Sequence, residues 1–588
     1  MFCKTDTSHQ LNMFSSTNTF LTGSRLKTYE DDNSWHNLFH EKVVLRIDEE
    51  IFRPLFCNDN GAPNSSIRLL IGMMILKEAH GISDAKLFED CEFNLLTRKA
   101  LGLFNMDDSI PAESTYYLLR KRIVEWEKAG NGNLMEKVFS QVTRSQVVEF
   151  KINGKNVRMD SKLLGSNIAW YSRYELIHET LRKAYPDIKH ELENLSLNSL
   201  DINLLESVVG ESGNKVSYRS SKTEIESKIA ELGILIYKII SGITNHSSES
   251  LQILFKVFSE QYFRDEDVIL PLPKEKISAT SIQSPHDTDC HYRQKADNQV
   301  KGYSINISET CDGDDSLNLV TNVQVNVCST ADCDFLQPSI ASTQEILSQK
   351  IETINADGDY HSVENQDYCK EKNIDFVLGA IQGKPPRYDL QLNEENNLII
   401  TDLQTGTIIP CRISKSRKKG NMPKWTIKDE NGKYRYFSQK EIDTCLLRKQ
   451  IRARTQTELN VRNNVEASIF QLGYHFPNNK SRYRGLSRHK IWANARCLWV
   501  NFVRIMNFIA RNVENCLQKL KYSIKFSQNW QNFVQFVFGI FILGNLCSIY
   551  QKIDFDYDFK KWTFWRGVKI YFFYYQIIQI MLYLFRLK

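Results

Sequence analysis

The sequence has no closely spaced pair of cysteines, and its thirteen cysteines are scattered over 588 residues. A small secreted protein held by disulfides usually has an even, clustered set, so this pattern predicts reduced thiols in a cytosolic protein. A secretory signal peptide is also lacking, because residues 1–26 are rich in Ser, Thr and Asn and contain no basic stretch followed by an apolar run. We therefore expect a cytoplasmic protein with a polar lead-in.

A strong net charge is absent too: 75 basic and 70 acidic residues leave only +5, which by itself indicates no class of partner. The charge is unevenly distributed, however. Residues 471–530 contain eleven Lys or Arg and a single acid, Glu514. Such a local positive field favours a polyanion. The hydrophobic content of 42% is that of an ordinary globular protein, and the length predicts three or four structural units.

Three acids stand where they could form one site. Asp160 closes the apolar run that begins at Lys155, Asp357 closes the run that begins at Ile351, and Glu466 follows Arg462 by one helical turn. Taken singly, each has a simpler interpretation, since strand-end acids often cap helices and an Arg–Glu pair four residues apart is usually a surface ion pair. Together, acids on two strands and a helix are the parts of a two-metal phosphoryl-transfer site.

Hydrophobic periodicity orders the elements around these acids. The first strand is followed by strands at 303–307 and 323–327, a helix at 338–347, a strand at 351–357, a helix at 362–372 and a strand at 374–378. This β-β-β-α-β-α-β order, with acids ending the first and fourth strands, is that of an α/β ribonuclease H-like core. It places Asp160 and Asp357 on adjacent strands.

The remaining segments predict further units around this core. Residues 61–145 contain short helices joined by Gly and Ser turns, and the helix that carries Arg120, Lys121 and Arg122 fits a helix-turn-helix or a small bundle with a solvated basic face equally well. Four units are predicted: a lead-in with the first helices at 1–60, an all-α N-terminal domain at 61–145, a catalytic domain at 150–510 and an apolar helical tail at 511–588. The catalytic domain contains a helical insertion at about 170–290 and a small β-rich insertion at about 385–450.

Two basic segments are candidates for DNA contact. Lys480, Arg482, Tyr483 and Arg484 precede Gly485, and basic residues interleaved with an aromatic suit a turn that follows phosphates. In the second insertion, Lys418 and Lys419 lie in a basic loop, where a solvated run of charge is the more common explanation.

Other residue groups carry weaker signals. His286, Asp287 and Asp289 could bind a metal, although a turn containing proline commonly uses such residues. Cys411 and Cys445 cannot complete a tetrahedral zinc site without further ligands. In the tail, the apolar runs 533–550 and 568–585 carry amides and are marginal in length for membrane spans, so we expect buried or oligomer-forming helices.

Taken in order, the motifs of residues 25–510 resemble those of bacterial insertion-sequence transposases of the DDE class, in the branch with an N-terminal helical transposase domain. The motifs that carry the resemblance are Phe88-Glu-Asp-Cys-Glu-Phe-Asn-Leu-Leu, Ile110-Pro-Ala-Glu-Ser-Thr-Tyr, Arg158-Met-Asp-Ser, Ser284-Pro-His-Asp-Thr-Asp, Ala356-Asp-Gly-Asp-Tyr-His-Ser, Val461-Arg-Asn-Asn-Val-Glu and Tyr483-Arg-Gly-Leu.

The resemblance implies that Asp160, Asp357 and Glu466 hold two Mg²⁺ ions, with Mn²⁺ able to substitute, and that Arg462 is the basic residue one turn before the glutamate. It further implies cleavage at the ends of an insertion sequence and transfer of the 3′-hydroxyl ends to target DNA. The expected partners are double-stranded DNA, as terminal inverted repeats and as target, and a second copy of the chain. The implied location is the nucleoid, and no small-molecule substrate is expected.

Two positions depart from the family pattern. Leu459 stands where relatives often have Tyr, and Gly473 stands where they often have Lys. Two other functions therefore stay open: a structure-selective nuclease of the same fold, which would cut without joining, and a decayed transposase that only binds DNA.

Overall fold

The structure is a computed structural model that describes residues 1–526, apart from gaps at 6–16, 18–19, 59, 244–246, 267, 296, 314–315, 382, 384–385, 394–396, 415–423 and 429–431. The chain divides into two compact units, Met1–Ile509 and Ala510–Lys588. Within the described residues, every helix and strand except the C-terminal end of the last helix belongs to the first unit.

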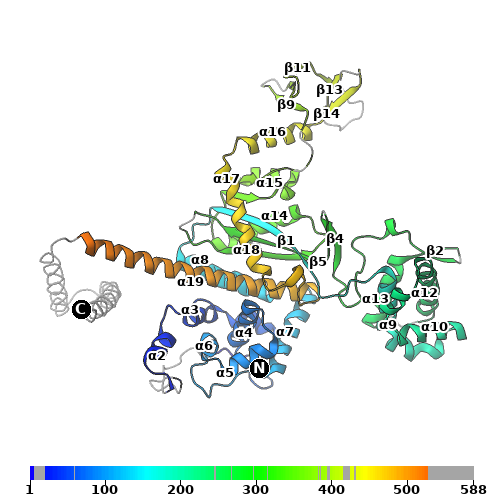
Figure 1. Ribbon diagram of the computed structural model, residues 1–588, viewed down its shortest axis with the longest axis horizontal. Coiled ribbons are helices and arrows are strands. Elements are labelled where there is room, and N and C mark those ends of the chain that lie inside the picture. The colour runs from blue at the N-terminus through cyan, green and yellow to red at the C-terminus, as the bar shows by residue number, and fades with distance from the viewer. Residues whose placement is uncertain are drawn as a thin grey trace. The chain divides into compact units, whose positions relative to one another are not determined.

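A six-stranded mixed sheet forms the centre of the first unit (Figure 1). Its strands are β1 (Asn156–Gly165), β4 (His291–Lys295), β5 (Asn298–Thr310), β6 (Val320–Val327), β7 (Thr353–Ala356) and β8 (Asp375–Leu378). The order is β4-β5-β1-β7-β8, and β6 pairs with β5. Strands β1, β7 and β8 are parallel, whereas β4, β5 and β6 are joined by antiparallel pairing. The predicted adjacency of the Asp160 and Asp357 strands is therefore confirmed.

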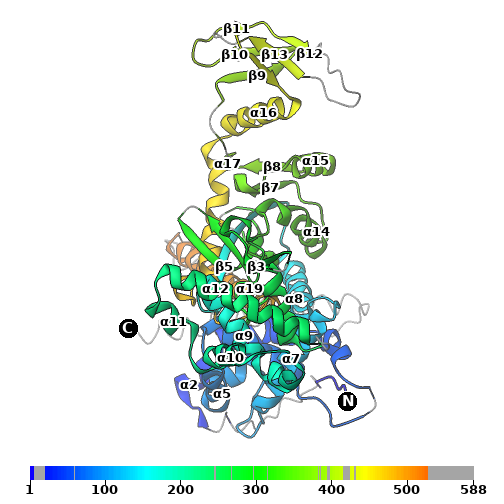
Figure 2. The ribbon, with the colours of Figure 1, turned by 90° about the vertical axis from the view of Figure 1, so that its right-hand side faces the viewer.

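The two faces of the sheet pack against different helices (Figure 2). On one face, Val157 and Met159 share a core with Leu336 and Ile340 of α14 (Leu336–Leu347), and α15 (Val363–Lys372) lies beside β8. On the other face, the alternate residues of β5 and β6 pack against α8 (Leu134–Phe150) and α19 (Leu486–Phe526). The apolar residues Ile491, Ala495, Leu498, Phe502 and Ile505 recur at helical spacing and are buried along α19, and Ile509 is half-buried.

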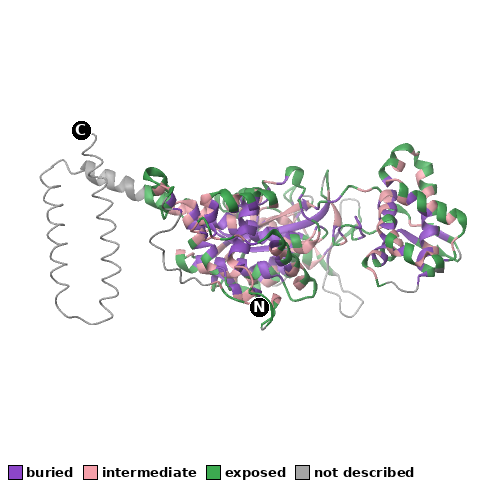
Figure 3. Ribbon diagram, turned by 90° about the horizontal axis from the view of Figure 1, so that it is seen from below, coloured by how far each residue is buried: buried purple, intermediate pink, exposed green. Residues whose placement is uncertain are grey.

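The N-terminal helices pack into the same core as the sheet. They are α2 (Gly23–Glu30), α3 (Trp35–Lys42), α4 (Ile67–His80), α5 (Asp84–Phe93), α6 (Leu95–Ala100) and α7 (Glu113–Lys128), followed by α8. Gly81 (φ 60°) ends α4 in the left-handed conformation, and the Ser83 side chain caps α5. Phe39 of α3 contacts Phe502 of α19 at 5.2 Å between ring centroids. The change from helical domain to sheet near residue 150 is thus not a boundary between cores (Figure 3).

Both predicted insertions have cores of their own. The first contains α9 (Arg173–Glu191), α10 (Ser199–Gly210), α11 (Gly213–Arg219), α12 (Lys222–Gly242), α13 (Glu249–Gln261), β2 (Tyr262–Asp265) and β3 (Val268–Pro271). The second contains β9 (Tyr388–Leu392), β10 (Leu398–Asp402), β11 (Ile408–Ile409), β12 (Arg412–Ser414), β13 (Lys424–Lys428), β14 (Tyr434–Phe437) and α16 (Gln439–Ala453). Their helical and β-rich characters agree with the sequence prediction.

The predicted apolar tail helices at 533–588 lie outside the described residues, as do Lys418 and Lys419. Within the part of the chain that the structure describes, no helix combines the length and apolarity needed to cross a bilayer.

Candidate active site

Asp160 lies in the middle of β1, not at its end. The strand was predicted to close at the acid, but β5 is thirteen residues long and pairs with β1 in an antiparallel ladder from Val157 to Gly165. The parallel partner β7 is shorter and pairs only with Asn156–Arg158. Asp160 therefore sits two residues beyond the parallel pairing, where the β7 side of β1 is open.

Asp357 follows the last residue of β7, as predicted, and begins a 3₁₀ turn, η6 (Gly358–Tyr360). Its carboxylate accepts a hydrogen bond from the Gly358 amide at 2.6 Å, which fixes the orientation of the side chain. A Cβ atom on Gly358 would lie 2.1 Å from the Ala380 carbonyl oxygen. Only glycine allows this close approach, so the backbone behind Asp357 is held by packing.

Arg462 and Glu466 come from a helical segment that is less regular than the single helix expected from the sequence. It runs as α17 (Gln456–Asn460), a 3₁₀ turn η7 (Val461–Asn463) and α18 (Asn464–Gly473). The turn tightens the backbone at Arg462 while keeping Arg462 and Glu466 on one side. Helix α18 lies across β1, which brings both side chains to Asp160.

All four side chains meet at one point. The Nη2 atom of Arg462 lies 3.6 Å from a carboxylate oxygen of Asp160, 3.7 Å from one of Asp357 and 3.7 Å from one of Glu466. Each of these three carboxylate oxygens lies within 3.7 Å of the Arg462 Nη2 atom, so any two of them are separated by no more than twice that distance. The structure thus brings together the three acids and the arginine that the sequence singled out, across more than 300 residues of chain.

Burial differs across the cluster and affects its charge. The side chain of Asp160 is 16% exposed, whereas that of Glu466 is 65% exposed. Burial raises the pKa of Asp160, and the nearby Asp357 carboxylate adds to this, while the Ser161 amide and Arg462 oppose it. A buried acid next to a second acid is a common arrangement at functional sites, because a bound cation can offset the repulsion.

The chemistry of the donors fits Mg²⁺, which prefers carboxylate oxygens. In their present arrangement the acids surround a guanidinium group, and the Nε atom of Arg462 is buried without a hydrogen-bond partner. Among the described residues, no three His, Cys, Asp or Glu side chains are close enough to hold an ion as they stand. Metal binding would therefore require Arg462 to turn away from the point where the carboxylates meet.

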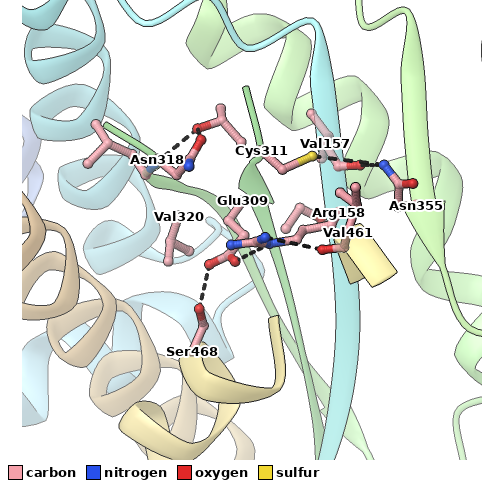
Figure 4. Close-up of polar contacts among 12 residues, drawn as sticks. Val157, Arg158, Glu309, Cys311, Asn318, Val320, Asn355, Val461 and Ser468 are labelled. Atoms are coloured by element: carbon pink, nitrogen blue, oxygen red, sulfur yellow. Dashed lines mark hydrogen bonds and ion pairs between the residues drawn. The ribbon is translucent and has the colours of Figure 1, made fainter. Parts of the chain in front are cut away.

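A buried glutamate that the sequence analysis missed supports the site from behind (Figure 4). The side chain of Glu309 on β5 has no exposed surface and forms ion pairs with Arg158 at 2.5 Å and Arg504 at 2.7 Å. It also accepts a hydrogen bond from Ser468 of α18 at 2.6 Å, while Arg158 donates to the Val461 carbonyl of η7 at 3.2 Å. The network therefore ties β1, β5 and α19 to the segment that carries Arg462 and Glu466.

The electrostatics of Glu309 follow from these partners. Burial alone would raise its pKa, but Arg504, Arg158 and Ser468 outweigh burial and hold the pKa below its ordinary value. The sequence did contain a signal. Tyr303, Ile305 and Ile307 alternate along the buried face of β5, and Glu309 occupies the next position of that alternation, where an apolar residue would be expected.

The two departures from the family pattern lie on the helices on either side of η7. Leu459 is half-buried in α17, and Gly473 ends α18. A Cβ atom at position 473 would lie 2.7 Å from the Nζ atom of Lys162, so the ammonium group of this β1 lysine occupies the space beside the glycine. Lys162 lies two residues after Asp160 and therefore on the same face of β1.

The residues predicted to contact DNA at positions 480–484 differ in how far their side chains are exposed. Lys480, Arg482 and Arg484 are exposed, and each also donates a hydrogen bond to a backbone carbonyl. Tyr483 is only 9% exposed, and its hydroxyl donates to Glu78 of α4. The Tyr483 ring packs in the core and links α4 to the segment before α19, so the predicted DNA contact of this residue stays a prediction.

These arginines line a groove of about 750 Å³ next to the N-terminal helices. From α4, α5 and α7 come Lys77, Asp84 and Arg120, and Lys77 and Arg120 both pair with Asp84, at 2.6 and 3.3 Å. The opposite side contributes Arg482, Arg484 and Arg488. Because one carboxylate faces five cations, the groove is positively charged and suited to phosphate.

The residues considered as further metal ligands make contacts within the protein. Asp287 is buried and accepts hydrogen bonds from Ser166 and Tyr303, and Asp289 accepts one from the Leu486 amide at 3.2 Å. These contacts fix the end of β1 to the start of α19. Cys445 donates to Asp389 at 3.3 Å, and the described residues around Cys411 and Cys445 offer no third metal ligand.

Residues 28–122, from α2 to α7, match the family described as Transposase domain (DUF772). No curated protein and no solved structure shows a significant match to the chain. The match to the N-terminal helices supports a transposase function.

Proposed function

We propose that this chain is a DNA transposase of the DDE class with a ribonuclease H-like catalytic core. It would cleave at the ends of an insertion sequence in a metal-dependent reaction and transfer the 3′-hydroxyl ends to target DNA. The observation that carries the proposal is the convergence of Asp160, Asp357 and Glu466 on Arg462. The transposase-domain match at residues 28–122, which comes from a different part of the chain, supports it independently.

The chain's own residues would bind and orient the reacting groups. Asp160, Asp357 and Glu466 would hold two Mg²⁺ or Mn²⁺ ions, which when bound activate the attacking oxygen and stabilise the leaving oxygen. Asp357 is aimed by the Gly358 amide, and Glu466 by the helix that Glu309 fixes. Arg462, once displaced from the carboxylates, would contact the phosphate under attack.

The basic groove would hold double-stranded DNA. Arg482, Arg484 and Arg488 face Lys77 and Arg120 across it, so phosphate contacts from the core and from the transposase domain would be made to one DNA segment. We expect the terminal inverted repeat as the first ligand, target DNA as the second, and two copies of the chain in the DNA complex.

We predict that Asp160→Asn, Asp357→Asn and Glu466→Gln each lower cleavage and joining at least about 100-fold, because a charge clamp fails as a unit. The substrate is a plasmid carrying the gene with its native flanking DNA, and the assay measures nicking at the flanks and joining to a second plasmid with Mg²⁺, with Mn²⁺ and with chelator. Glu352→Gln is the matched control, since Glu352 precedes β7 and is 61% exposed.

The outcomes separate the competing functions. Cutting without joining would indicate a nuclease, and binding without metal-dependent cutting would indicate a decayed transposase. Near-normal cleavage by any one of the three variants would remove that acid from the site.

A further inference from the structure

A second hollow lies beside the open part of β1 and is not part of the carboxylate cluster. Its volume is about 530 Å³, and its lining begins at Ser161, the residue after Asp160. Its lining also includes residues 478–480, which precede the arginines of the basic groove in the sequence. The hollow therefore lies next to the β1 segment that carries Asp160.

The lining of this hollow is strongly basic. It contains the single carboxylate Asp332 and five cationic side chains: Lys162, Arg293, Lys295, Lys301 and Lys480. Arg293 and Lys295 lie 3.4 and 3.6 Å from Asp332, and Lys295 also pairs with Asp359 at 2.8 Å, so the excess of positive charge comes from Lys162, Lys301 and Lys480. The excess of positive charge favours an anion.

Lys162 lacks a compensating group within the part of the chain that the structure describes, where it forms no ion pair or hydrogen bond. Its side chain is half-buried. A partly desolvated cation without a counter-charge is unfavourable in the free protein. A bound phosphate would supply the missing charge.

The rim of the hollow carries an aromatic side chain. Trp170 is 56% exposed, although large aromatic rings are usually buried. The Nζ atom of Lys301 lies 4.8 Å from the Trp170 ring centroid and donates to the Tyr171 carbonyl at 2.9 Å. This cation–π contact holds the indole in place at the rim of the hollow.

We propose that this hollow is a subsite for one unpaired nucleotide of the DNA, with its base stacked on Trp170 and its phosphate held by Lys162 and the neighbouring cations. Base stacking on an exposed aromatic beside a basic groove is a general mode of single-strand binding. A base inside a duplex is covered by its neighbours and cannot reach the ring, so the nucleotide must be unpaired. The identity of the ligand as DNA rests on the proposed function.

The test uses the full chain and two DNA probes, a blunt duplex and the same duplex with a four-nucleotide 3′ extension that contains 2-aminopurine. Stacking on Trp170 is expected to quench the 2-aminopurine fluorescence. Trp170→Ala is expected to abolish the quenching and to weaken binding of the extended duplex about 5- to 100-fold. Binding of the blunt duplex is expected to stay unchanged, and Trp170→Phe to restore most of the effect.

Two further variants complete the test. Lys162→Gln is expected to reduce the preference for the extended duplex, whereas Tyr218→Ala, which removes a 91% exposed aromatic in the first insertion, is expected to have no effect. Equal weakening of both probes by Trp170→Ala, or no quenching with the unaltered protein, would overturn the subsite. Cleavage of the flanking-DNA plasmid is measured separately. Quenching that depends on Trp170 without any cleavage would refute the transposase function alone, and cleavage without quenching would refute the subsite alone.

Discussion

Glu309 shows how a single residue outside the carboxylate cluster can control its geometry. Its side chain has no exposed surface and contacts Arg158, Arg504 and Ser468. Removing one partner of a buried ion pair typically costs about 3–5 kcal/mol, because the remaining charges stay buried without compensation. The same change would release α18 from the sheet and loosen the placement of Glu466.

We predict that Glu309→Gln lowers cleavage about 10- to 100-fold, as expected for a residue that positions others, while DNA binding is retained. The control is Glu345→Gln, which removes a 76% exposed carboxylate that pairs with Arg144. A loss of cleavage that merely parallels a loss of folded protein, measured by circular dichroism at the assay temperature, would contradict a positioning role.

The same residue predicts a pH dependence of stability. The pKa of Glu309 is held below its ordinary value in the folded protein, so the folded state binds the proton less readily than the unfolded state. The stabilisation is therefore complete above the unfolded pKa of about 4.3 and is lost as the pH falls through the folded pKa. Thermal unfolding of the unaltered protein and of Glu309→Gln between neutral and acidic pH should converge at the acid end.

Among the elements, the sequence predicted best those with strong periodicity. The alternating strands β5 and β6 appear where they were expected, and helices with regularly spaced apolar residues bury them on one side. Helix α12 is an example, since Ile229, Leu232, Ile236 and Ile239 are buried along one side. These patterns arise because one face of each element is buried, and the spacing of apolar residues in the local sequence shows which face that is.

Features that depend on a distant partner were less predictable. The extension of β1 beyond Asp160 depends on the length of β5, which lies more than 130 residues away. The burial of Tyr483 depends on Glu78 of α4, and that of Glu309 on Arg504 of α19. Sequence analysis found the three acids and Arg462 because they stand within recognisable motifs, but it did not find the residues that hold them.

The segment 480–484 carries a prediction of its own. Replacing Lys480, Arg482 and Arg484 together by Gln should weaken binding to all duplex DNA and lower the slope of log affinity against log salt by about one for each lost phosphate contact. Each side chain is exposed, so its charge is available to DNA. The control replaces Lys215, Lys222 and Lys256, three exposed lysines of the first insertion. An unchanged slope with altered sequence preference would assign the segment to base recognition.

At the scale of the whole molecule, the transposase-domain helices and the sheet are continuous. Aromatic contacts join α3 to α19, and the Tyr483–Glu78 hydrogen bond joins α4 to the segment before α19. DNA held in the basic groove would therefore touch two parts of one packed body. Under the proposed function, this packing would couple recognition of the DNA end to placement of the scissile phosphate.

The first insertion is different, because its helices have a core of their own and its ends meet. The Arg173 side chain donates to the Leu272 carbonyl at 2.8 Å and to the Gln261 carbonyl at 2.5 Å. The two ends of the segment 173–272 thus lie close together, although Ile282, which follows the segment, still packs in the insertion core. Joining Ser172 to Pro273 through a short Gly/Ser linker should leave a folded protein, since closing such a loop costs little.

Deletion of the insertion would then show what it contributes. If the shortened chain still cuts DNA and keeps the Trp170-dependent quenching, the insertion is an accessory that an ancestral, smaller enzyme could have acquired without rebuilding its catalytic centre. If the shortened chain folds, as judged by cooperative thermal unfolding, but no longer cuts, the insertion takes part in the reaction. The contact between Arg173 and Leu272 marks the place at which the segment can be removed in this experiment.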